Sequence, residues 1–400
     1  PSGGLRDLPF VAVVDLTVDD GRLEAPAVAE DPLVDVSAGL SALVVRAPDH
    51  LVVEEARVTL GDAVAGTLAL TVTGLPDAPF VDLDARLDEA DCQAVVDALP
   101  RALLGPYDRV EVDGRMAPYL DITVPLADPD ALTLDLKGLR VGCRVTALNA
   151  RPAGWPPVTV GGARPDLTDV AWLNQPFART VTEGTTGRRA VTVGPGSGAY
   201  VPLGSLPPYV GAAMFLSEEI DFYETHAINR GLVWRALRTN LAGRRFVYGG
   251  SGVAQQLVKN LFLTREKTLA RKLQEVLVAD RMGHAVGKDR VLELYLNCIE
   301  FGPDLYGIGP AARYYFEKPA SALDPVEAVF LAMLKPAPYQ GPWMKSRGRM
   351  FGGAWWADRM ETLMARLVEY GYLTPAQADA ARPYEVRWED GRYIGHGEGG

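Results

Sequence analysis

Long hydrophobic runs are absent from this chain, and cysteine is scarce. No stretch of 18 or more apolar residues occurs in the 400, so the sequence predicts no helix that spans a bilayer. The three cysteines, Cys92, Cys143 and Cys298, do not have the spacing of a metal-binding cluster. We interpret them as three buried thiols, and the alternative is a disulfide between Cys92 and Cys143 in an oxidising compartment.

Basic side chains are scarce in the first half of the chain. Residues 1–200 hold 16 Lys+Arg against 29 Asp+Glu, whereas residues 201–400 hold 24 against 22. Within residues 215–290 there are 13 basic and 8 acidic side chains. Long-range attraction to an anionic ligand is therefore expected only in the second half. Because no recognised nucleic-acid-binding module is present, we expect no nucleic-acid partner.

The composition is that of a globular protein with more than one core. Hydrophobic residues make up 48% and charged residues 23% of the chain. A length of 400 residues exceeds one ordinary domain, and no internal repeat is visible. The chain starts at Pro1 without an initiator methionine or a signal-peptide pattern. We therefore expect a fragment that follows a membrane anchor.

Residues 1–150 are predicted to form a β-rich domain of unknown role. Apolar and polar residues alternate in short segments such as Thr67–Val72 and Tyr119–Val124, which are separated by Gly, Asp and Pro. This pattern is typical of a mostly antiparallel sheet. One helix is expected, with Asp88 as its N-cap. The many aspartates are interpreted as a solvated sheet face, with an acidic binding surface as the alternative.

The remaining residues change from connecting to helical character. Residues 151–204 are rich in Pro and Gly and are predicted to be a connecting region. Residues 205–383 follow a helical period and are predicted to form a mainly α-helical domain, with residues 384–400 as a tail. Capping boxes with proline at the first helical position begin at Asp324 and Thr374. The expected fold class is α+β, with more than one domain.

An acidic pair ends an apolar segment near the start of the helical domain. Glu218 and Glu219 follow Ala212–Leu216, and Glu218 lies four residues before Phe222. A carboxylate backed by apolar side chains is partly desolvated, which raises its pKa and makes it a better proton acceptor. Glu218 is therefore the candidate general base, and an exposed acid at a helix end is the alternative.

A glycine-rich loop leads into a helix that carries amides and a cation. Backbone N–H groups in such a loop and at a helix N-terminus attract an anion. Gln255 and Lys259 are separated by four residues, so they are expected to face the same way. The candidate ligands of an anionic group are Ser251, Gln255, Gln256 and Lys259.

A second cationic helix is expected after Thr264, its predicted N-cap. Lys267, Arg271 and Glu275 recur at intervals of four residues, which places two cations and a carboxylate on one helix face. Lys272 adds a further cation beside them. An ordinary surface ladder of ion pairs is the alternative interpretation.

The order of these blocks resembles the peptidoglycan glycosyltransferases of glycosyltransferase family 51, lysozyme-like enzymes that polymerise lipid II into glycan strands. The resemblance extends over residues 205–383 and includes Lys288–Asn297, Phe301–Gly302 and Arg359–Met364. Since the chain ends soon after the last block, it resembles the monofunctional type, without a transpeptidase. The residues to which the resemblance gives a structural role are Phe222, Glu293, Tyr295, Asn297 and Arg359.

Several positions in the first two blocks depart from the family pattern. Thr225 stands where the family usually has a histidine, and Glu219 stands where it has an aspartate. A Ser-Thr pair is replaced by Ser251-Gly252. An arginine is replaced by Lys267, which keeps the charge but loses the bidentate fork. Both candidate catalytic carboxylates are retained.

The resemblance implies glycosyl transfer with inversion at the anomeric carbon. Glu218 would take the proton from the 4-hydroxyl group of lipid II. Lys259, Lys267 and Arg271 would stabilise the departing undecaprenyl pyrophosphate, and Glu275 would orient these cations. The resemblance also allows for a divalent cation such as Mg²⁺, with Glu275 as its ligand.

The expected partners are lipid II, the nascent glycan strand and a membrane surface, with other cell-wall proteins as further candidates. The basic amphipathic segment Gly231–Arg238 suits the headgroup region of a membrane. The expected location is the bacterial cell envelope, at the outer (periplasmic) face of the cytoplasmic membrane. Two alternatives are a degenerate homologue that binds precursor or glycan without turnover, and a lytic lysozyme-like enzyme that cleaves glycan.

Overall fold

The computed structural model of the chain divides into two compact units. It describes residues 9–126, 133–135, 140–149, 158–163, 165–183, 187–225, 229, 231–232, 235–236, 239, 249–263, 268–347, 354–384, 386–387 and 393–394. The first unit combines the chain up to residue 152 with residues 230–250 and 265–281, and the second combines residues 153–229, 251–264 and 282–400. Within the described ranges, no helix has both the length and the apolar character needed to cross a bilayer.

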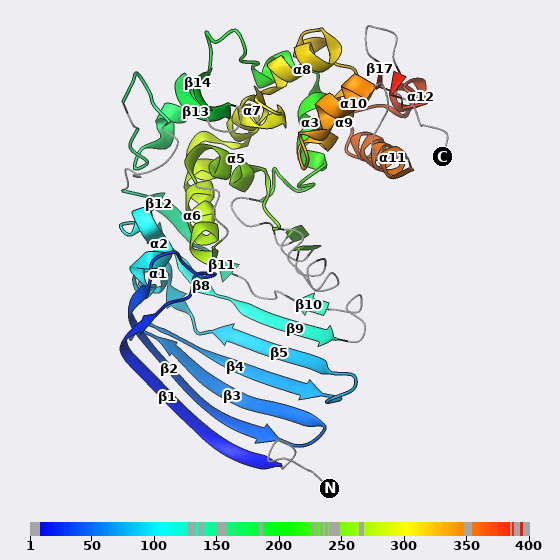
Figure 1. Cartoon of the computed structure of the whole chain (residues 1–400). Coiled ribbons are helices and arrows are strands. Elements are labelled where there is room, and N and C mark those ends of the chain that lie inside the picture. The colour runs from blue at the N-terminus through cyan, green and yellow to red at the C-terminus, as the bar shows by residue number, and fades with distance from the viewer. Residues whose placement is uncertain are drawn as a thin grey trace. The chain divides into compact units, whose positions relative to one another are not determined.

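The first unit is built on a seven-stranded antiparallel sheet with the strand order β1-β2-β3-β4-β5-β9-β10 (Figure 1). The alternation of apolar and polar residues explains why these segments pair as strands. Their antiparallel pairing confirms the sheet predicted from the sequence. Strand β1 pairs with β2 and forms one edge. The strands are β1 (Phe10–Leu23), β2 (Leu33–Arg46), β3 (His50–Leu60), β4 (Val64–Thr73), β5 (Phe80–Leu87), β9 (Tyr119–Pro125) and β10 (Thr133–Asp135).

Short helices and strands follow β5. The first helix, α1, is capped by Asp91, so the predicted N-cap Asp88 is wrong. Helix α1 begins at Cys92, and the Asp91 side chain accepts hydrogen bonds from the backbone N–H groups of Gln93 (2.9 Å) and Ala94 (3.2 Å). Asp88 is still held by the sheet, where its side chain pairs with Arg57. The short elements are α1 (Cys92–Asp97), α2 (Arg101–Leu104), β6 (Ala90–Asp91), β7 (Glu111–Asp113), β8 (Arg115–Ala117), β11 (Arg140–Val141) and β12 (Arg144–Ala147).

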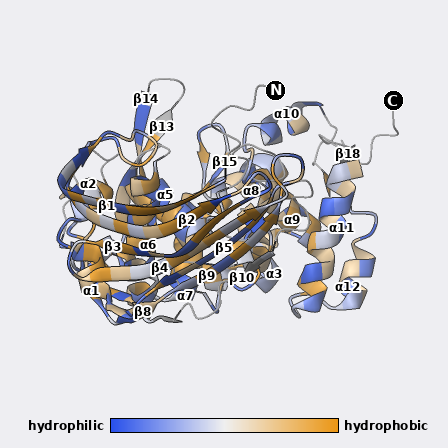
Figure 2. Ribbon diagram, turned by 90° about the horizontal axis from the view of Figure 1, so that it is seen from below, coloured by the Kyte–Doolittle hydropathy of each residue, from blue (hydrophilic) through white to orange (hydrophobic). Residues whose placement is uncertain are grey.

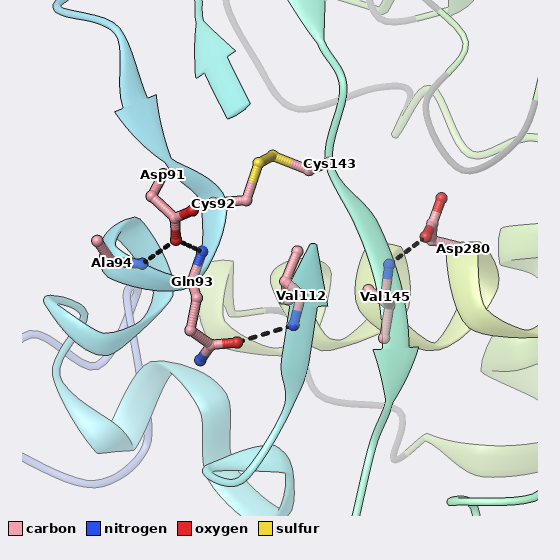
Figure 3. Close-up of a disulfide and its surroundings, with 8 residues drawn as sticks. All are labelled: Asp91, Cys92, Gln93, Ala94, Val112, Cys143, Val145 and Asp280. Carbon is pink, nitrogen blue, oxygen red and sulfur yellow. Dashed lines mark hydrogen bonds between the residues drawn. A yellow bond between two sulfur atoms is a disulfide. The ribbon is translucent and has the colours of Figure 1, made fainter. Parts of the chain in front are cut away.

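Cys92 and Cys143 form a disulfide, so the favoured interpretation of three buried thiols is wrong for this pair. Their Cα atoms are 5.7 Å apart, and the bond joins the first residue of α1 to the segment between β11 and β12 (Figure 3). The Gln93 side chain adds a second link, since its oxygen accepts a hydrogen bond from the Val112 N–H (2.8 Å). Cys298 is a buried free thiol, as expected.

Helix α6 (Leu269–Val286) is anchored on the first unit along its N-terminal part. The N–H groups of Leu269 and Ala270 donate to the carbonyl groups of Ala27 (3.2 Å) and Val28 (2.8 Å). Farther along the helix, the Asp280 carboxylate accepts a hydrogen bond from the Val145 N–H of β12 at 2.8 Å (Figure 3). Because two of these bonds join backbone groups and the third joins a side chain of the helix to the backbone of β12, they fix the helix on this unit.

The second unit is mainly helical and surrounds helix α3. Residues 210–216 of α3 are all buried, and a helix that is apolar on all sides is typical of a core position. Helices α9 and α11 pack against it, as does α7. Its helices are α3 (Pro208–Leu216), α5 (Val253–Phe262), α7 (Lys288–Cys298), α8 (Ile308–Phe316), α9 (Pro325–Leu334), α10 (Gln340–Arg347), α11 (Ala354–Glu369) and α12 (Pro375–Ala380).

The capping boxes predicted at Asp324 and Thr374 are both confirmed. Asp324 exchanges hydrogen bonds with Glu327 at the start of α9, and Thr374 does so with Gln377 at the start of α12. An N-terminal antiparallel sheet followed by helices is thus confirmed, whereas a lysozyme-like arrangement of the helices stays a prediction.

The predicted connecting region contains an unforeseen hairpin. Strands β13 (Phe177–Glu183) and β14 (Gly187–Val193) pair in the second unit, after a 3₁₀ turn at Val170–Asn174. Trp172 and Phe177 pack edge to face with ring centroids 5.4 Å apart, so this region contributes to the core. The other described elements of the unit are short: β15 (Glu300–Gly302) with β16 (Leu305–Tyr306), β17 (Val386–Arg387) with β18 (Tyr393–Ile394), and 3₁₀ turns at Leu203–Ser205 and Ala320–Ala322.

Reduction of the disulfide is expected to destabilise the first unit. The bond closes a sequence separation of 51 residues, for which the chain-entropy model gives about 4 kcal/mol and measurements on other proteins give about 2–5 kcal/mol. Urea unfolding of the wild-type chain should shift to lower concentration when dithiothreitol is added. The double variant Cys92→Ser/Cys143→Ser is the control and should not respond to the reductant. An unchanged midpoint in the wild type would contradict the prediction.

Candidate functional site

Glu218 lies directly after the C-terminal end of the buried helix α3. Its N–H donates to the carbonyl group of Phe215 (2.9 Å), so the chain continues the helical turn. A helix end leaves its last carbonyl groups without partners in the helix, and a buried end needs other donors. The residues around Glu218 therefore have to supply those donors.

Three cations supply hydrogen bonds to this helix end. Lys335, which follows α9, donates its Nζ to the Met214 carbonyl (2.5 Å) and to the Ser217 hydroxyl (2.8 Å). From α11, Arg359 donates to the Ser217 carbonyl at 3.3 Å. Arg366, two turns farther along α11, donates to the Leu216 carbonyl at 3.0 Å. Cations at a helix C-terminus are also favoured by the helix dipole.

The Glu218 carboxylate is held by two of its neighbours. Its Oε2 accepts a hydrogen bond from the Gln256 amide at 2.9 Å, and Lys335 Nζ lies 3.4 Å from its Oε1. Gln256 in turn accepts a hydrogen bond from the Tyr295 hydroxyl (2.8 Å), which orients its amide. The Glu218 side chain is 13% exposed, so it is not completely closed off from solvent.

The pKa of Glu218 is lowered, which contradicts the expectation from the sequence. Burial acts to raise the pKa of this carboxyl, as predicted, but the charge of Lys335 and the Gln256 hydrogen bond outweigh it, with Arg359 adding to the effect. The sequence pattern showed the apolar residues before Glu218 but not the cations, because these come from distant helices. Glu218 is therefore a carboxylate at neutral pH.

Lys335 is a functional candidate that sequence reasoning missed. Its side chain is buried beside Glu218, and burial lowers the pKa of its ammonium group while the Glu218 charge acts in the opposite direction. Nζ also lies 5.5 Å from the centre of the Tyr295 ring. One signal was available: after Glu327, α9 is entirely apolar, and Lys335 is the first charged residue to follow.

The neighbouring acid, Glu219, is buried and tied to three groups. Its Oε2 accepts a hydrogen bond from the Val253 N–H (2.9 Å), the first residue of α5. Its Oε1 accepts from the Thr225 hydroxyl (2.6 Å) and the Asn229 amide (3.1 Å). Glu219 thus joins the end of α3 to the start of α5, and its role is structural.

Three departures from the family pattern meet at this carboxylate. Glu219, Thr225 and Gly252 are the altered positions, and the first two are hydrogen bonded to each other. A Cβ atom added at Gly252 would lie 2.3 Å from Glu219 Oε2, closer than nonbonded atoms approach. The longer acid therefore occupies the space that a side chain at position 252 would need. These substitutions form one compatible set, and the set leaves Glu218 in place.

The N-terminus of α5 binds an anionic group of the chain itself, the Glu219 carboxylate. The sequence predicted that these amides face a substrate, whereas the Val253 N–H donates to Glu219. Gln255 is 4% exposed, and Lys259, one turn later, is exposed. The Ser251 carbonyl accepts a hydrogen bond from Gln256 (3.2 Å). Binding of a substrate by these residues stays a prediction.

Glu275 is fully buried on α6 and neutralised by two cations. Arg271 approaches one carboxylate oxygen at 2.7 Å and Lys272 approaches the other at 2.6 Å. Thr268 accepts a hydrogen bond from the Arg271 N–H (3.1 Å) and occupies the cap position, because α6 begins at Leu269. The described start of α6 is thus capped by Thr268, and both the predicted N-cap Thr264 and Lys267 lie outside the described residues.

The donors around Glu275 do not fit a divalent cation. Both carboxylate oxygens face positively charged groups, which would repel Mg²⁺. Within the described ranges, no group of three or more His, Cys, Asp or Glu side chains is arranged to hold a metal ion. The Mg²⁺ expectation thus receives no support from these residues.

The residues with expected structural roles hold α7 and the turns around it. Glu293 accepts hydrogen bonds from the Tyr200 hydroxyl and from the Leu203 N–H (2.7 Å). Burial and the bond to Glu293 raise the pKa of Tyr200 to about 12. Asn297 bonds both backbone groups of Val201, at 2.8 and 2.9 Å.

Phe222 anchors the segment after Glu218 in the same unit. It is fully buried and stacks on Phe215, with ring centroids 5.7 Å apart. Lys288 Nζ lies 4.5 Å from the centre of the Phe222 ring, which ties the segment to the start of α7. Glu218 belongs to the second unit and Glu275 to the first, so the cleft predicted between them stays a prediction.

Comparison with known proteins identifies relatives of the second half of the chain. A family model described as Transglycosylase matches residues 187–366. Penicillin-binding protein 1A of Aquifex aeolicus is 36% identical over 207 residues, which are 51% of this chain but 28% of that protein. Biosynthetic peptidoglycan transglycosylase of Nitrosospira multiformis is 34% identical over 160 residues, 38% of this chain and 70% of the relative. The protein of that name from Nitrosomonas eutropha is 42% identical over 122 residues, 30% and 50% of the two chains.

Glu219 and Gly252 are expected to be energetically coupled. Gly252→Ala should destabilise the second unit by about 1–3 kcal/mol because the new methyl group overlaps the carboxylate. Glu219→Asp should also destabilise, since its shorter side chain leaves donors without a partner. The double variant should lose about 0.5–3 kcal/mol less than the sum of the two, as urea unfolding would measure. Strictly additive losses would contradict the close contact.

Proposed function

Because this chain belongs to the transglycosylase family of peptidoglycan glycosyltransferases, we propose that it polymerises lipid-linked disaccharide units into glycan strands. The observation that carries the proposal is the Glu218 carboxylate at the end of a buried helix. It is kept ionised by Lys335 and Gln256 and is partly accessible. Such a group is prepared to accept a proton from a sugar hydroxyl.

Glu218 acts as the general base in the proposed reaction. It takes the proton of the acceptor's 4-hydroxyl group while that oxygen forms a bond to the anomeric carbon of the donor. The bond from this carbon to the pyrophosphate breaks with inversion, and the pyrophosphate leaves with the electron pair. General-base catalysis of this kind contributes roughly 10²–10⁴ in rate. The low pKa reduces the intrinsic basicity of Glu218 but keeps it deprotonated at neutral pH.

Cationic side chains serve the leaving group. Lys259 is exposed near the end of α5, and Arg271 and Lys272 stand on α6 with Glu275 between them. Glu275 positions these cations by pairing with both, so that their remaining N–H donors face the pyrophosphate. No step passes through a divalent cation.

The two alternatives are less well supported. A degenerate binding homologue was suggested by the altered first block, but the altered residues form a hydrogen-bonded cluster around Glu219 rather than replacing Glu218. A lytic enzyme would need no cations for a pyrophosphate. The two relatives named biosynthetic peptidoglycan transglycosylase, covered to 70% and 50% of their lengths, also favour synthesis over cleavage.

The proposed location is the bacterial cell envelope, where lipid II and the growing glycan strand are the partners. The chain spans 28% of the length of the Aquifex aeolicus penicillin-binding protein, so the activity of that whole protein is not transferred to it. A membrane surface also belongs to the proposal. The segment Gly231–Arg238, on which it rests, lies largely outside the described residues.

Glu218→Gln should abolish polymerisation and leave substrate binding intact. The amide preserves the size and hydrogen bonds of the side chain but accepts no proton, so the loss falls on kcat, by about 10² or more. The wild-type chain, incubated with labelled lipid II, should form polymer that separates from the precursor on a denaturing gel. Glu369→Gln, at an exposed acid, is the control. Binding without polymer in the wild type, unaffected by Glu218→Gln, would establish the degenerate homologue instead.

Lys335→Met should raise the pKa of Glu218, because it removes the main opposing charge. The rate depends on the deprotonated form of Glu218, so the acid limb of the pH–rate profile should move to higher pH.

The same substitution should change the pH dependence of stability. The stability that the low pKa of Glu218 confers is present above about pH 4.3 and is lost as the pH falls through the folded-state pKa. As the pH falls, the free energy of unfolding of the variant, measured by urea unfolding, should therefore decrease less than that of the wild type. Lys345→Met, at a partly buried lysine that is hydrogen bonded to the Tyr314 carbonyl group, is the control, and an unmoved acid limb in Lys335→Met would contradict the role.

A further inference from the structure

The seven-stranded sheet has one face made almost entirely of aliphatic side chains. In an antiparallel sheet, paired residues point to the same face, so the register defines rows across the strands. One row consists of Ala12, Val44, Val53, Leu70, Leu83 and Ile122. The adjacent rows on the same face are also Leu, Val, Ala and Gly, apart from Phe10 and Arg46 near one end. We call this surface the aliphatic face.

The opposite face is polar from β4 onward, which makes the two sides chemically distinct. On this face, Thr71, Asp82 and Thr123 form a row. They are the sequence neighbours of Leu70, Leu83 and Ile122 on the aliphatic face. Figure 2 shows the resulting alternation of hydrophobic and hydrophilic bands along the strands. A sheet with this pattern normally buries its apolar side under a second layer.

In the described part of the chain, Ala29 and Leu33 form a small core with Ala270 of α6 at one corner of the sheet. On the aliphatic face itself, Ala42, Ala56, Val64 and Val124 are buried, whereas the other large side chains are partly buried or exposed. Leu70 and Leu83, in the middle of the sheet, are only partly buried. At the β1 edge, Phe10 is 51% and Leu16 is 56% exposed. Such exposure is unusual for central and edge positions of an apolar sheet face.

The aliphatic face is large enough to be a binding surface. Five strand spacings of about 4.8 Å across the six strands of these rows and ten residues of about 3.3 Å give roughly 24 Å by 33 Å, on the order of 800 Å². The largest exposed apolar patch on a monomer is usually about 300–600 Å², and larger patches mark binding sites. A hydrocarbon leaflet is about 15 Å thick, half of the bilayer core, so an acyl chain fits along a strand.

The chemistry of the face favours hydrocarbon over protein. Protein interfaces are enriched in Tyr, Trp, Phe, Met and Arg as anchors, whereas the interior of this face has only Leu, Ile, Val, Ala and Gly. The charge of the sheet region disfavours docking of this face on an anionic bilayer. Residues 9–126 contain 22 Asp+Glu and 7 Arg but no Lys, and anionic bilayers attract Lys and Arg.

We propose that the aliphatic face binds the hydrocarbon chains of individual lipid molecules, withdrawn from a bilayer. Burial of methylene groups against Leu, Val and Ile is favourable by about 0.8 kcal/mol for each, and it requires no polar partner on the face. The site is distinct from Glu218, because the aliphatic face belongs wholly to the first unit.

The test uses the complete 400-residue chain and neutral phosphatidylcholine vesicles with a radiolabelled acyl chain. After incubation, the vesicles are removed by flotation, and the lipid that stays with the soluble protein is counted. The wild-type chain should retain about one or more lipid molecules per chain. Leu70→Asp should reduce this tenfold or more, because a carboxylate is not buried against hydrocarbon without a large cost. Thr71→Asp, on the opposite face of the same strand, should retain lipid as the wild type does.

A second measurement covers the case in which Leu70→Asp does not fold. A polarity-sensitive fluorophore is attached at Leu70→Cys or at Thr71→Cys, with the unsubstituted chain as the control for labelling at Cys298. Lipid should shift the emission to the blue at position 70 and not at position 71.

Three outcomes would overturn the proposal. The first is folded protein that retains no lipid and shows no shift. The second is flotation of the wild-type protein with the vesicles that is lost in Leu70→Asp and kept in Thr71→Asp, which indicates that the aliphatic face docks on a bilayer. The third is a concentration-dependent shift at position 70 without lipid, accompanied by a dimer in light scattering, which indicates a second copy of the chain.

Discussion

The buried C-terminal end of α3 is the constraint on which the second unit depends. A helix that is apolar on every side must lie in the core, and its last carbonyl groups then lie away from water. Lys335, Arg359 and Arg366 satisfy them from two other helices, so these helices have to approach the same point. Because Lys335 also contacts Glu218, the requirement of the backbone and the ionisation of the candidate base are met by one side chain.

The local features of this protein were predictable from the sequence, and the long-range ones were not. Alternation of apolar and polar residues predicted the antiparallel sheet, and short-range patterns predicted the capping boxes at Asp324 and Thr374. The position of Glu218 after an apolar helix was also correct. Each of these signals lies within a few neighbouring residues.

The failures arose where a distant partner decides the outcome. The apolar residues before Glu218 gave the wrong direction for its pKa, since Lys335 lies more than 100 residues away in the chain. The disulfide was not favoured, because pairing depends on β11 and β12 bringing Cys143 to α1. The cap of α1 lies at Asp91 rather than Asp88 because Ala90 and Asp91 first pair with β8 as strand β6.

The first unit contributes to the placement of a candidate catalytic residue. Glu275, with Arg271 and Lys272, stands on a helix whose start is hydrogen bonded to residues 27 and 28 and whose later part is bonded to β12. The family match begins only at residue 187, yet its α6 segment is anchored on strands and loops far upstream of that position. The β-rich half is therefore part of the environment of this helix and not an independent appendage.

The contact between Glu219 and Gly252 limits the routes by which such a sequence can arise. A chain with glutamate at position 219 and threonine at position 252 would have two groups in one space, whereas aspartate with glycine weakens the hydrogen bonds of position 219 but causes no overlap. Of the two single-substitution routes between the family pattern and this chain, the one that passes through glycine first therefore avoids the steric barrier. The glycine is then hard to reverse, because every return to a larger residue at that position must wait for the acid to shorten.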